Sequence, residues 1–119
     1  MLVAIHAFEN IYQGLHGIED YVVVEVADEK DAIETALNMS YEVIDSYGDI
    51  YSDFYSDAEF EGLEEGTDEW EEYIEAARAE DTAFDIFLVK ETTKTLEELN
   101  NMIYHDPEGF IEEYCTNME

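Results

Sequence analysis

Residues 20–27 read DYVVVEVA, and the hydrophobic pattern of the chain changes directly after them, at Asp28. The β-branched valines of this stretch fill both faces of an extended chain, which predicts a buried strand over residues 20–27. Beyond Asp28 the apolar residues recur at intervals of three and four, the spacing of one helical face. A strand followed directly by such a helix predicts a sheet with helices packed against it.

A long first helix is expected after this change of pattern. The acidic residues at its start, Asp28, Glu29 and Asp31, interact favourably with the helix dipole. Gly48 is either the end of this helix or a weak point within it. The residues expected on its inward stripe are Ile33, Leu37, Ser40, Ile44, Tyr47 and Tyr51.

Two more segments, residues 2–8 and 83–90, are strand-like and complete a small three-stranded sheet. Residues 9–19 contain two glycines and are expected to connect the first two strands. Residues 57–67 also contain two glycines and show no clear period, which predicts a loop or a frayed helix end.

A second helix is expected over residues 68–80, because four apolar residues recur there at helical spacing. These four residues are Trp70, Tyr73, Ile74 and Ala77. Two later helices are indicated by their start signals. Thr95 and Glu98 match a capping box, and Asp106 with Pro107 has the chemistry of a helix start. The predicted fold is α+β, a three-stranded sheet with about four helices in the order ββααβαα, forming a single domain over residues 1–119.

The composition is strongly acidic, since 33 Asp and Glu against four Lys and Arg give a formal charge of -29. A disordered tail is not expected, because 46% of the residues are hydrophobic and 13% are aromatic. A globule of this length has a radius of gyration of roughly 13–14 Å. Over the corresponding diameter of about 35 Å, B-DNA carries roughly 20 phosphate charges, so the protein would match or exceed DNA in charge per length.

A tetrad repeat runs through residues 47–58, which read YGDI, YSDF and YSDA. On a helix each four-residue step climbs about 6 Å, so aspartates at this spacing form a slowly turning row whose spacing resembles that of phosphates along a DNA strand. Like charges one turn apart destabilise a helix, so folding alone gives no reason for the row. The alternative is a solvated helix face that keeps the protein soluble. The row consists of Asp45, Asp49, Asp53 and Asp57.

The middle third of the chain supplies about half of the negative charge. Residues 42–81 contain sixteen acidic residues and one base, Arg78, whereas Lys30, Lys90 and Lys94 lie outside this range. A charge run is usually a solvated face, but mixed signs serve solubility better than one sign. Besides the aspartate row, the acidic residues expected to bind a partner are Glu59, Glu61, Glu64, Glu65, Asp68, Glu69, Glu71, Glu72 and Glu75.

In size, charge and aromatic content the chain resembles the acidic DNA-mimic proteins that phages and mobile elements use against restriction, CRISPR or other DNA-binding machinery. The resemblance is one of class, and it rests on the aspartate row and on the acidic cluster from Glu59 to Glu75. It implies an inhibitor that occupies the basic nucleic-acid-binding surface of a nuclease, CRISPR effector, restriction enzyme or transcription factor. Three tyrosines of the repeat either add contact area beside the carboxylates or form the wet edge of a core stripe. They are Tyr47, Tyr51 and Tyr55.

Other classes of function find less support in the sequence. Four basic residues cannot neutralise a phosphate backbone, so direct binding of nucleic acid is not expected. The aspartate spacing does not match an EF-hand and no Cys-His cluster is present, so neither a metal site nor a cofactor is expected. An enzyme is not expected either, because acidic neighbours would raise the pKa of the lone thiol, Cys115. Two alternatives stay open: an acidic accessory protein of phage or halophile type, and a weak binder of divalent cations.

The first seven residues, MLVAIHA, lack the basic flank and the cleavage pattern of a signal peptide, and no apolar run is long enough to cross a bilayer. A lone cysteine fits a reducing compartment. We therefore expect a soluble cytoplasmic protein without membrane partners, located in a bacterial host cell if a phage encodes it. The sequence leaves the oligomeric state open.

Overall fold

The computed structural model describes residues 1–10, 19–46 and 48–118, with the side chain of Asp49 excepted. Within these residues lies an antiparallel sheet with the strand order β2-β1-β3-β4. The strands are β1 (Leu2–Glu9), β2 (Glu19–Glu25), β3 (Thr82–Val89) and β4 (Cys115–Asn117). The three strands expected from the sequence are present, and β4 extends the sheet at the outer side of β3.

Alternation along the central strand β1 gives the sheet two buried faces. Val3 and Ile5 are buried on one face, whereas Ala4 between them is buried on the other face together with Val23. Ile5 lies opposite Val22 in the ladder between β1 and β2. Because both faces carry apolar residues, helices are needed on both sides of the sheet.

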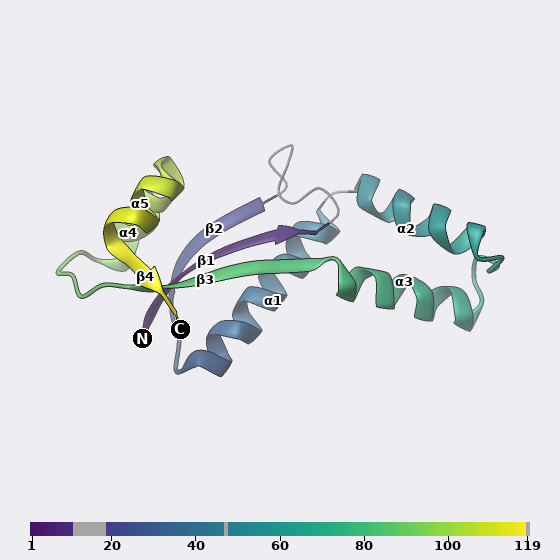
Figure 1. Cartoon of the computed structure of the whole chain (residues 1–119), viewed down its shortest axis with the longest axis horizontal. Helices are drawn as coiled ribbons and strands as arrows, with labels where there is room; N and C mark the ends of the chain where they lie inside the picture. Colours follow the sequence, from purple (N-terminus) through teal and green to yellow (C-terminus); the bar gives the residue numbers. More distant parts are fainter. Residues whose placement is uncertain (11–18, 47, 119) are drawn as a thin grey trace.

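Three helices cover these two faces. The helix α1 (Glu29–Asp45) packs on the face that carries Val3 and Ile5. The helices α4 (Leu96–His105) and α5 (Pro107–Tyr114) pack on the opposite face, at the end of the sheet near the two chain termini (Figure 1). The sheet is thus enclosed between helical layers, as an α+β fold requires.

The side chain of Asn100, on α4, forms two hydrogen bonds with the backbone of the edge strand β2. Its Oδ1 accepts a hydrogen bond from the backbone N–H of Val23 at 2.8 Å, and its Nδ2 donates to the carbonyl of the same residue at 2.9 Å. The side-chain amide thus takes the place of one rung of a neighbouring strand. This contact hinders pairing of the β2 edge with another chain.

The buried stripe of α1 agrees with the predicted one at Ser40 and Ile44 but differs from it at Ile33. Ile33 was expected to face inward but is 43% exposed, so this prediction is wrong. Alanine has no side chain beyond Cβ, and alanines on the sheet-facing stripe allow α1 to pack closely on the strands, which turns the larger Ile33 outward. The buried residues of α1 are Ala32, Ala36, Ser40, Val43 and Ile44.

Ser40 is the polar member of this buried stripe. Its side chain is fully buried, and its hydroxyl donates to the carbonyl of Phe8 at 2.6 Å and accepts from the N–H of Ala83 at 3.0 Å. One side chain therefore connects α1 to both β1 and β3. It also satisfies two backbone groups whose burial would otherwise be costly.

The helices α2 (Gly48–Phe60) and α3 (Asp68–Glu80) lie side by side and project beyond the sheet (Figure 1). The molecule is therefore elongated, with principal extents of 56 × 28 × 22 Å and a Cα radius of gyration of 16.8 Å. These dimensions correct the globular expectation of roughly 13–14 Å. The difference arises because α2 and α3 pack mainly on each other instead of covering the sheet.

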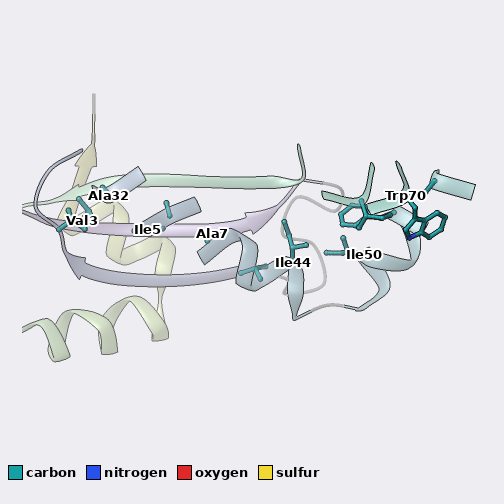
Figure 2. Close-up of a cluster of buried hydrophobic side chains, with 13 residues drawn as sticks. Val3, Ile5, Ala7, Ala32, Ile44, Ile50 and Trp70 are labelled. Atoms are coloured by element: carbon teal, nitrogen blue, oxygen red, sulfur yellow. The ribbon is translucent and has the colours of Figure 1, made fainter. Parts of the chain in front are cut away.

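A continuous hydrophobic core joins this projecting pair of helices to the sheet. Figure 2 shows the core running from Val3 and Ile5 of β1 through Ile44 and Ile50 to Trp70 of α3. Full burial of a large apolar side chain contributes about 1.5–3 kcal/mol. The core contacts therefore hold α2 and α3 to the rest of the fold.

The predicted fold class is corrected in its details. The described residues form four strands and five helices in the order ββαααβααβ, where three strands and about four helices were expected. The strand β4 has three residues, too few to show an alternating pattern. The long first helix is in fact two helices, because α1 ends where Ser46 donates its backbone N–H to the carbonyl of Glu42, and α2 begins at Gly48. Residues 57–60 form the end of α2, whereas residues 61–67 form the predicted loop.

The local start signals of the other helices are confirmed. The helix α3 spans Asp68–Glu80, as its apolar spacing predicted. Thr95 and Glu98 form a reciprocal capping box at the start of α4. Asp106 caps α5 by accepting a hydrogen bond from its backbone, with Pro107 in the first turn.

Candidate functional site

We call residues 48–80, which comprise α2, α3 and the turn between them, the acidic hairpin. They contain thirteen acidic residues and one base, Arg78. The hairpin includes most of the residues that the sequence indicated for partner binding. Its local structure explains how so many like charges are held on one projection.

The turn begins with a Schellman motif at the end of α2. The backbone N–H of Leu63 donates to the carbonyl of Ala58 at 3.1 Å, and that of Gly62 donates to the carbonyl of Glu59 at 2.9 Å. Gly62 has a φ of 81°, a conformation that favours glycine. This motif closes α2 and turns the chain toward α3.

The helix α3 begins at a capping residue. The hydroxyl of Thr67 accepts a hydrogen bond from the backbone N–H of Trp70 at 3.3 Å, which is typical of an N-cap. Asp68, Glu69 and Glu71 follow in the first turn, where negative charge interacts favourably with the helix dipole. These three carboxylates therefore stabilise the start of α3, although they lie among like charges.

All nine acidic residues predicted between Glu59 and Glu75 are exposed to solvent. The inward faces of the two helices carry Phe54, Ala58 and Trp70 instead. Exposed carboxylates of one sign on both helices and on the turn create a strong negative potential around the hairpin. The structure thus places this part of the predicted surface where a partner can reach it.

Asp45 is exposed, but its carboxylate is paired within the protein. It is the last residue of α1, and its Oδ1 and Oδ2 accept hydrogen bonds from Arg78 Nε at 2.9 Å and Nη2 at 2.7 Å. Its Oδ1 also accepts from the hydroxyl of Tyr51 at 2.6 Å. The hydrogen bonds from Arg78 hold the pKa of Asp45 below its ordinary value, and Asp45 in turn raises the pKa of Arg78. The one base of the acidic hairpin is therefore neutralised within the fold.

The predicted row of four aspartates is interrupted between α1 and α2. Asp45 lies on α1, whereas Asp53 and Asp57 lie on α2, so they do not share one helix. Asp53 is half-buried and Asp57 is exposed, while the side chain of Asp49 is outside the described part of the chain. The helix break, which the tetrad spacing did not reveal, is the reason that a continuous outward row of four carboxylates does not form.

The described tyrosines of the repeat have different environments. Tyr51 is half-buried. Burial is the main cause that raises the pKa of its hydroxyl, and the hydrogen bond to Asp45 raises it further. Tyr55 is 44% exposed, and its ring stacks on that of Trp70 with a centroid distance of 5.7 Å and an interplanar angle of 15°. Tyr47 lies outside the described residues. Tyr51 therefore has an internal contact, while Tyr55 offers an aromatic surface to a partner.

A groove of about 400 Å³ lies against α2 and α3, and we call it the tyrosine groove. It combines aromatic rings with carboxylates, and Arg78 lies at it as well. Aromatic faces and carboxylates both attract cations, so this groove is chemically suited to a positively charged group. Its aromatic and acidic lining residues are Tyr51, Tyr55, Trp70, Glu65, Glu71 and Glu75.

The pairing of Asp45 with Arg78 was missed by the sequence analysis, which assigned Asp45 to the partner-binding row. The two residues are 33 positions apart, so no helical or strand spacing relates them. A signal was nevertheless present, because Arg78 is the one base among sixteen acidic residues of the middle third. An isolated opposite charge in such a run indicates an internal partner.

The described ranges 1–10, 19–46 and 48–118 form neither a metal-binding site nor an activated thiol. No group of three or more His, Cys, Asp or Glu side chains is arranged there to hold a metal ion. Cys115 is buried, and this burial raises the pKa of its thiol to about 11. The expected cause, acidic neighbours, is corrected, since desolvation dominates and Lys90 acts in the opposite direction. The thiol is therefore protonated at neutral pH and not activated as a nucleophile.

Comparisons of the chain with family models, with curated proteins and with solved structures found no match. No helix in the described part of the chain has the length and apolar character needed to span a membrane.

Proposed function

We propose that the protein is a non-enzymatic inhibitor that mimics DNA and occupies the basic nucleic-acid-binding surface of another protein. The observation that carries the proposal is the acidic hairpin, which exposes nine carboxylates between Glu59 and Glu75. Its one base, Arg78, is paired with Asp45 and so does not compete for these carboxylates. A basic surface that meets the hairpin therefore encounters negative charge on both helices and the turn.

Charge per unit length supports the same proposal. The molecule is 56 Å long and carries a formal charge of -29. B-DNA of that length carries about 33 phosphate charges. The protein thus approaches the charge density of a duplex without exceeding it, which corrects the expectation based on a shorter globule.

The mechanism is competition for Lys and Arg residues that normally contact phosphates. Long-range attraction between the hairpin and a basic surface accelerates association, and salt screens this attraction over about 8–10 Å. The partner is a nuclease, a CRISPR effector, a restriction enzyme or a transcription factor. The inhibitor acts in the cytoplasm of a bacterial host if a phage encodes it, and it binds no nucleic acid itself.

A competition experiment at constant ionic strength tests this function. Proteins from a bacterial lysate are retained on the immobilised protein and then eluted with a short DNA duplex. Each eluted protein is bound to a labelled duplex, and the soluble inhibitor is added as competitor. We expect the duplex to elute the partner and the inhibitor to displace the labelled duplex from it.

Polyglutamate of equal total charge serves as the matched control competitor. If polyglutamate displaces the duplex as efficiently as the protein does, the effect is one of bulk charge and the mimicry proposal is wrong. A gel shift of the protein with bare duplex at physiological salt would contradict the proposal as well. An acidic accessory protein or a weak cation binder would retain no protein that the duplex elutes.

A further inference from the structure

The tyrosine groove has aromatic walls that solvent reaches. Tyr55 is 44% exposed, while Trp70 behind it is only 4% exposed. Figure 2 shows Trp70 at the outer end of the hydrophobic core, where the core reaches the acidic hairpin. In this stacked pair, Trp70 is fixed in the hydrophobic core and Tyr55 is accessible to a ligand.

Carboxylates accompany these rings in the groove. Glu71 and Glu75 are one helical turn apart on α3, so they lie on the same face, and both line the groove together with Glu65. All three are exposed. Arg78 also lines the groove, but its charge is paired with Asp45, so the three glutamates leave a net negative charge that repels an anion. Charge complementarity therefore selects a cation as the occupant.

The protein already holds one guanidinium by the same combination of groups. The Arg78 side chain is bound by both carboxylate oxygens of Asp45, and its guanidinium carbon lies 4.1 Å from the centre of the Tyr41 ring. A planar guanidinium can stack on an aromatic ring while it donates two parallel hydrogen bonds, which an ammonium group cannot do. The groove offers the same two kinds of group, an aromatic ring and carboxylates.

We propose that the tyrosine groove binds an arginine side chain of the basic partner, with the guanidinium stacked on Tyr55 and hydrogen-bonded to Glu71 and Glu75. This inference rests on the proposed function and adds to it a preference for arginine over lysine. The long-range attraction comes from the whole acidic hairpin, whereas the groove supplies the local recognition. Because the Tyr55 ring carries no charge, its removal tests the stacking contact without altering the long-range attraction.

Two short glycine-spaced peptides with equal numbers of arginine or lysine test the inference by isothermal titration calorimetry at about 0.15 M ionic strength. We expect the wild-type protein to bind the arginine peptide about 2–5-fold more tightly, the range typical of an exposed cation–π contact. Tyr55→Leu removes the ring without changing the charge, and it is expected to abolish this preference. Tyr104→Leu, at a tyrosine that is 82% exposed on α4, is the matched control and keeps the preference.

A second pair of variants covers the case in which Tyr55→Leu disturbs folding. Glu71→Gln with Glu75→Gln is expected to weaken binding of the arginine peptide more than Glu97→Gln with Glu112→Gln, which removes the same charge from α4 and α5. Equal affinity of the wild-type protein for both peptides, or equal effects of the two double variants, overturns the groove inference. Such a result leaves the proposed function intact, because displacement of duplex from a partner is measured separately. Failure of that displacement overturns both.

Discussion

Arg78 on α3 donates two hydrogen bonds to Asp45 at the end of α1, from Nε to Oδ1 at 2.9 Å and from Nη2 to Oδ2 at 2.7 Å. This contact connects the acidic hairpin to the helix that packs on the sheet. It also neutralises the one base of the hairpin. The same pair therefore has a structural role and an electrostatic one.

Arg78→Ala is expected to lower the free energy of unfolding by about 1 kcal/mol. The partly exposed ion pair contributes about 0.2–1 kcal/mol, and the stacking on Tyr41 contributes about 0.5–1 kcal/mol. Urea denaturation followed by circular dichroism measures the difference. Lys94→Ala, which removes an equal charge from an exposed position, is the control. Equal losses in the two variants would show that the contact does not stabilise the fold.

The same ion pair predicts a pH dependence. The pKa of Asp45 in the folded protein is below its ordinary value of 3.8, so its ionised form stabilises the fold above that value. This contribution is lost as the pH falls through the folded pKa. Asp45→Asn is therefore expected to be less stable than the wild type at neutral pH and to approach it as the pH falls below the folded pKa of Asp45. Urea denaturation at stepped pH tests this, with Glu91→Gln as an exposed control; a gap that stays constant would contradict the prediction.

Ser40→Ala is expected to destabilise the protein by about 1–3 kcal/mol, because the backbone groups of Phe8 and Ala83 lose their buried partner. Ser52→Ala, at an exposed position of α2, is the control for loss of a hydroxyl group. Thermal unfolding of both variants gives the comparison. A melting temperature of Ser40→Ala equal to that of the control would mean that neither backbone group depends on the hydroxyl.

Cys115 is expected to react slowly with thiol reagents in the folded protein. Its pKa of about 11 leaves roughly one thiol in a thousand ionised at pH 8, and burial also limits access. Labelling should become fast in urea, where both effects disappear. The chain contains a single cysteine, so the labelling signal comes from this thiol alone. Equal labelling rates in the folded and unfolded protein would contradict the assigned environment.

Features that depend on neighbouring residues were predictable from the sequence. The strand around Val23, the helix α3 and the capping box of Thr95 and Glu98 all have local signals that the structure confirms. The acidic cluster was also predictable, because exposed glutamates follow from charge and helical spacing.

Features that depend on distant contacts were not predictable. The bond between Asn100 and Val23 joins residues 77 positions apart, and the pairing of Asp45 with Arg78 joins residues on different helices. Ser40 and Ile44 were correctly placed on the inward stripe of α1, but Ile33 was misassigned because hydrophobicity favours Ile33, whereas close packing on the sheet favours alanine. The spacing of the tetrad repeat likewise contains no information about the break between α1 and α2.

We expect the partner to contact the acidic hairpin more closely than the rest of the protein surface. Lysine is introduced at four exposed hairpin positions that do not line the tyrosine groove, or at four exposed positions outside the hairpin. Each reversal changes the charge by two units, so both variants move from -29 to -21. The hairpin variant is Glu61→Lys, Glu64→Lys, Glu69→Lys and Glu72→Lys. The control variant is Glu91→Lys, Glu97→Lys, Glu112→Lys and Glu113→Lys.

The hairpin variant is expected to lose far more affinity for the duplex-eluted partner, because a lost interfacial charge pair costs about 2–5 kcal/mol when it is buried in the complex. A rim charge mainly alters the association rate, so the control should associate more slowly with little change in dissociation. Surface plasmon resonance at two salt concentrations separates these rates, and circular dichroism verifies that both variants are folded. Because the two variants have the same net charge, any difference in affinity between them is due to where the substituted residues lie. Similar losses of affinity in both folded variants would show that the partner senses only bulk charge, and the hairpin would then be a solvated surface.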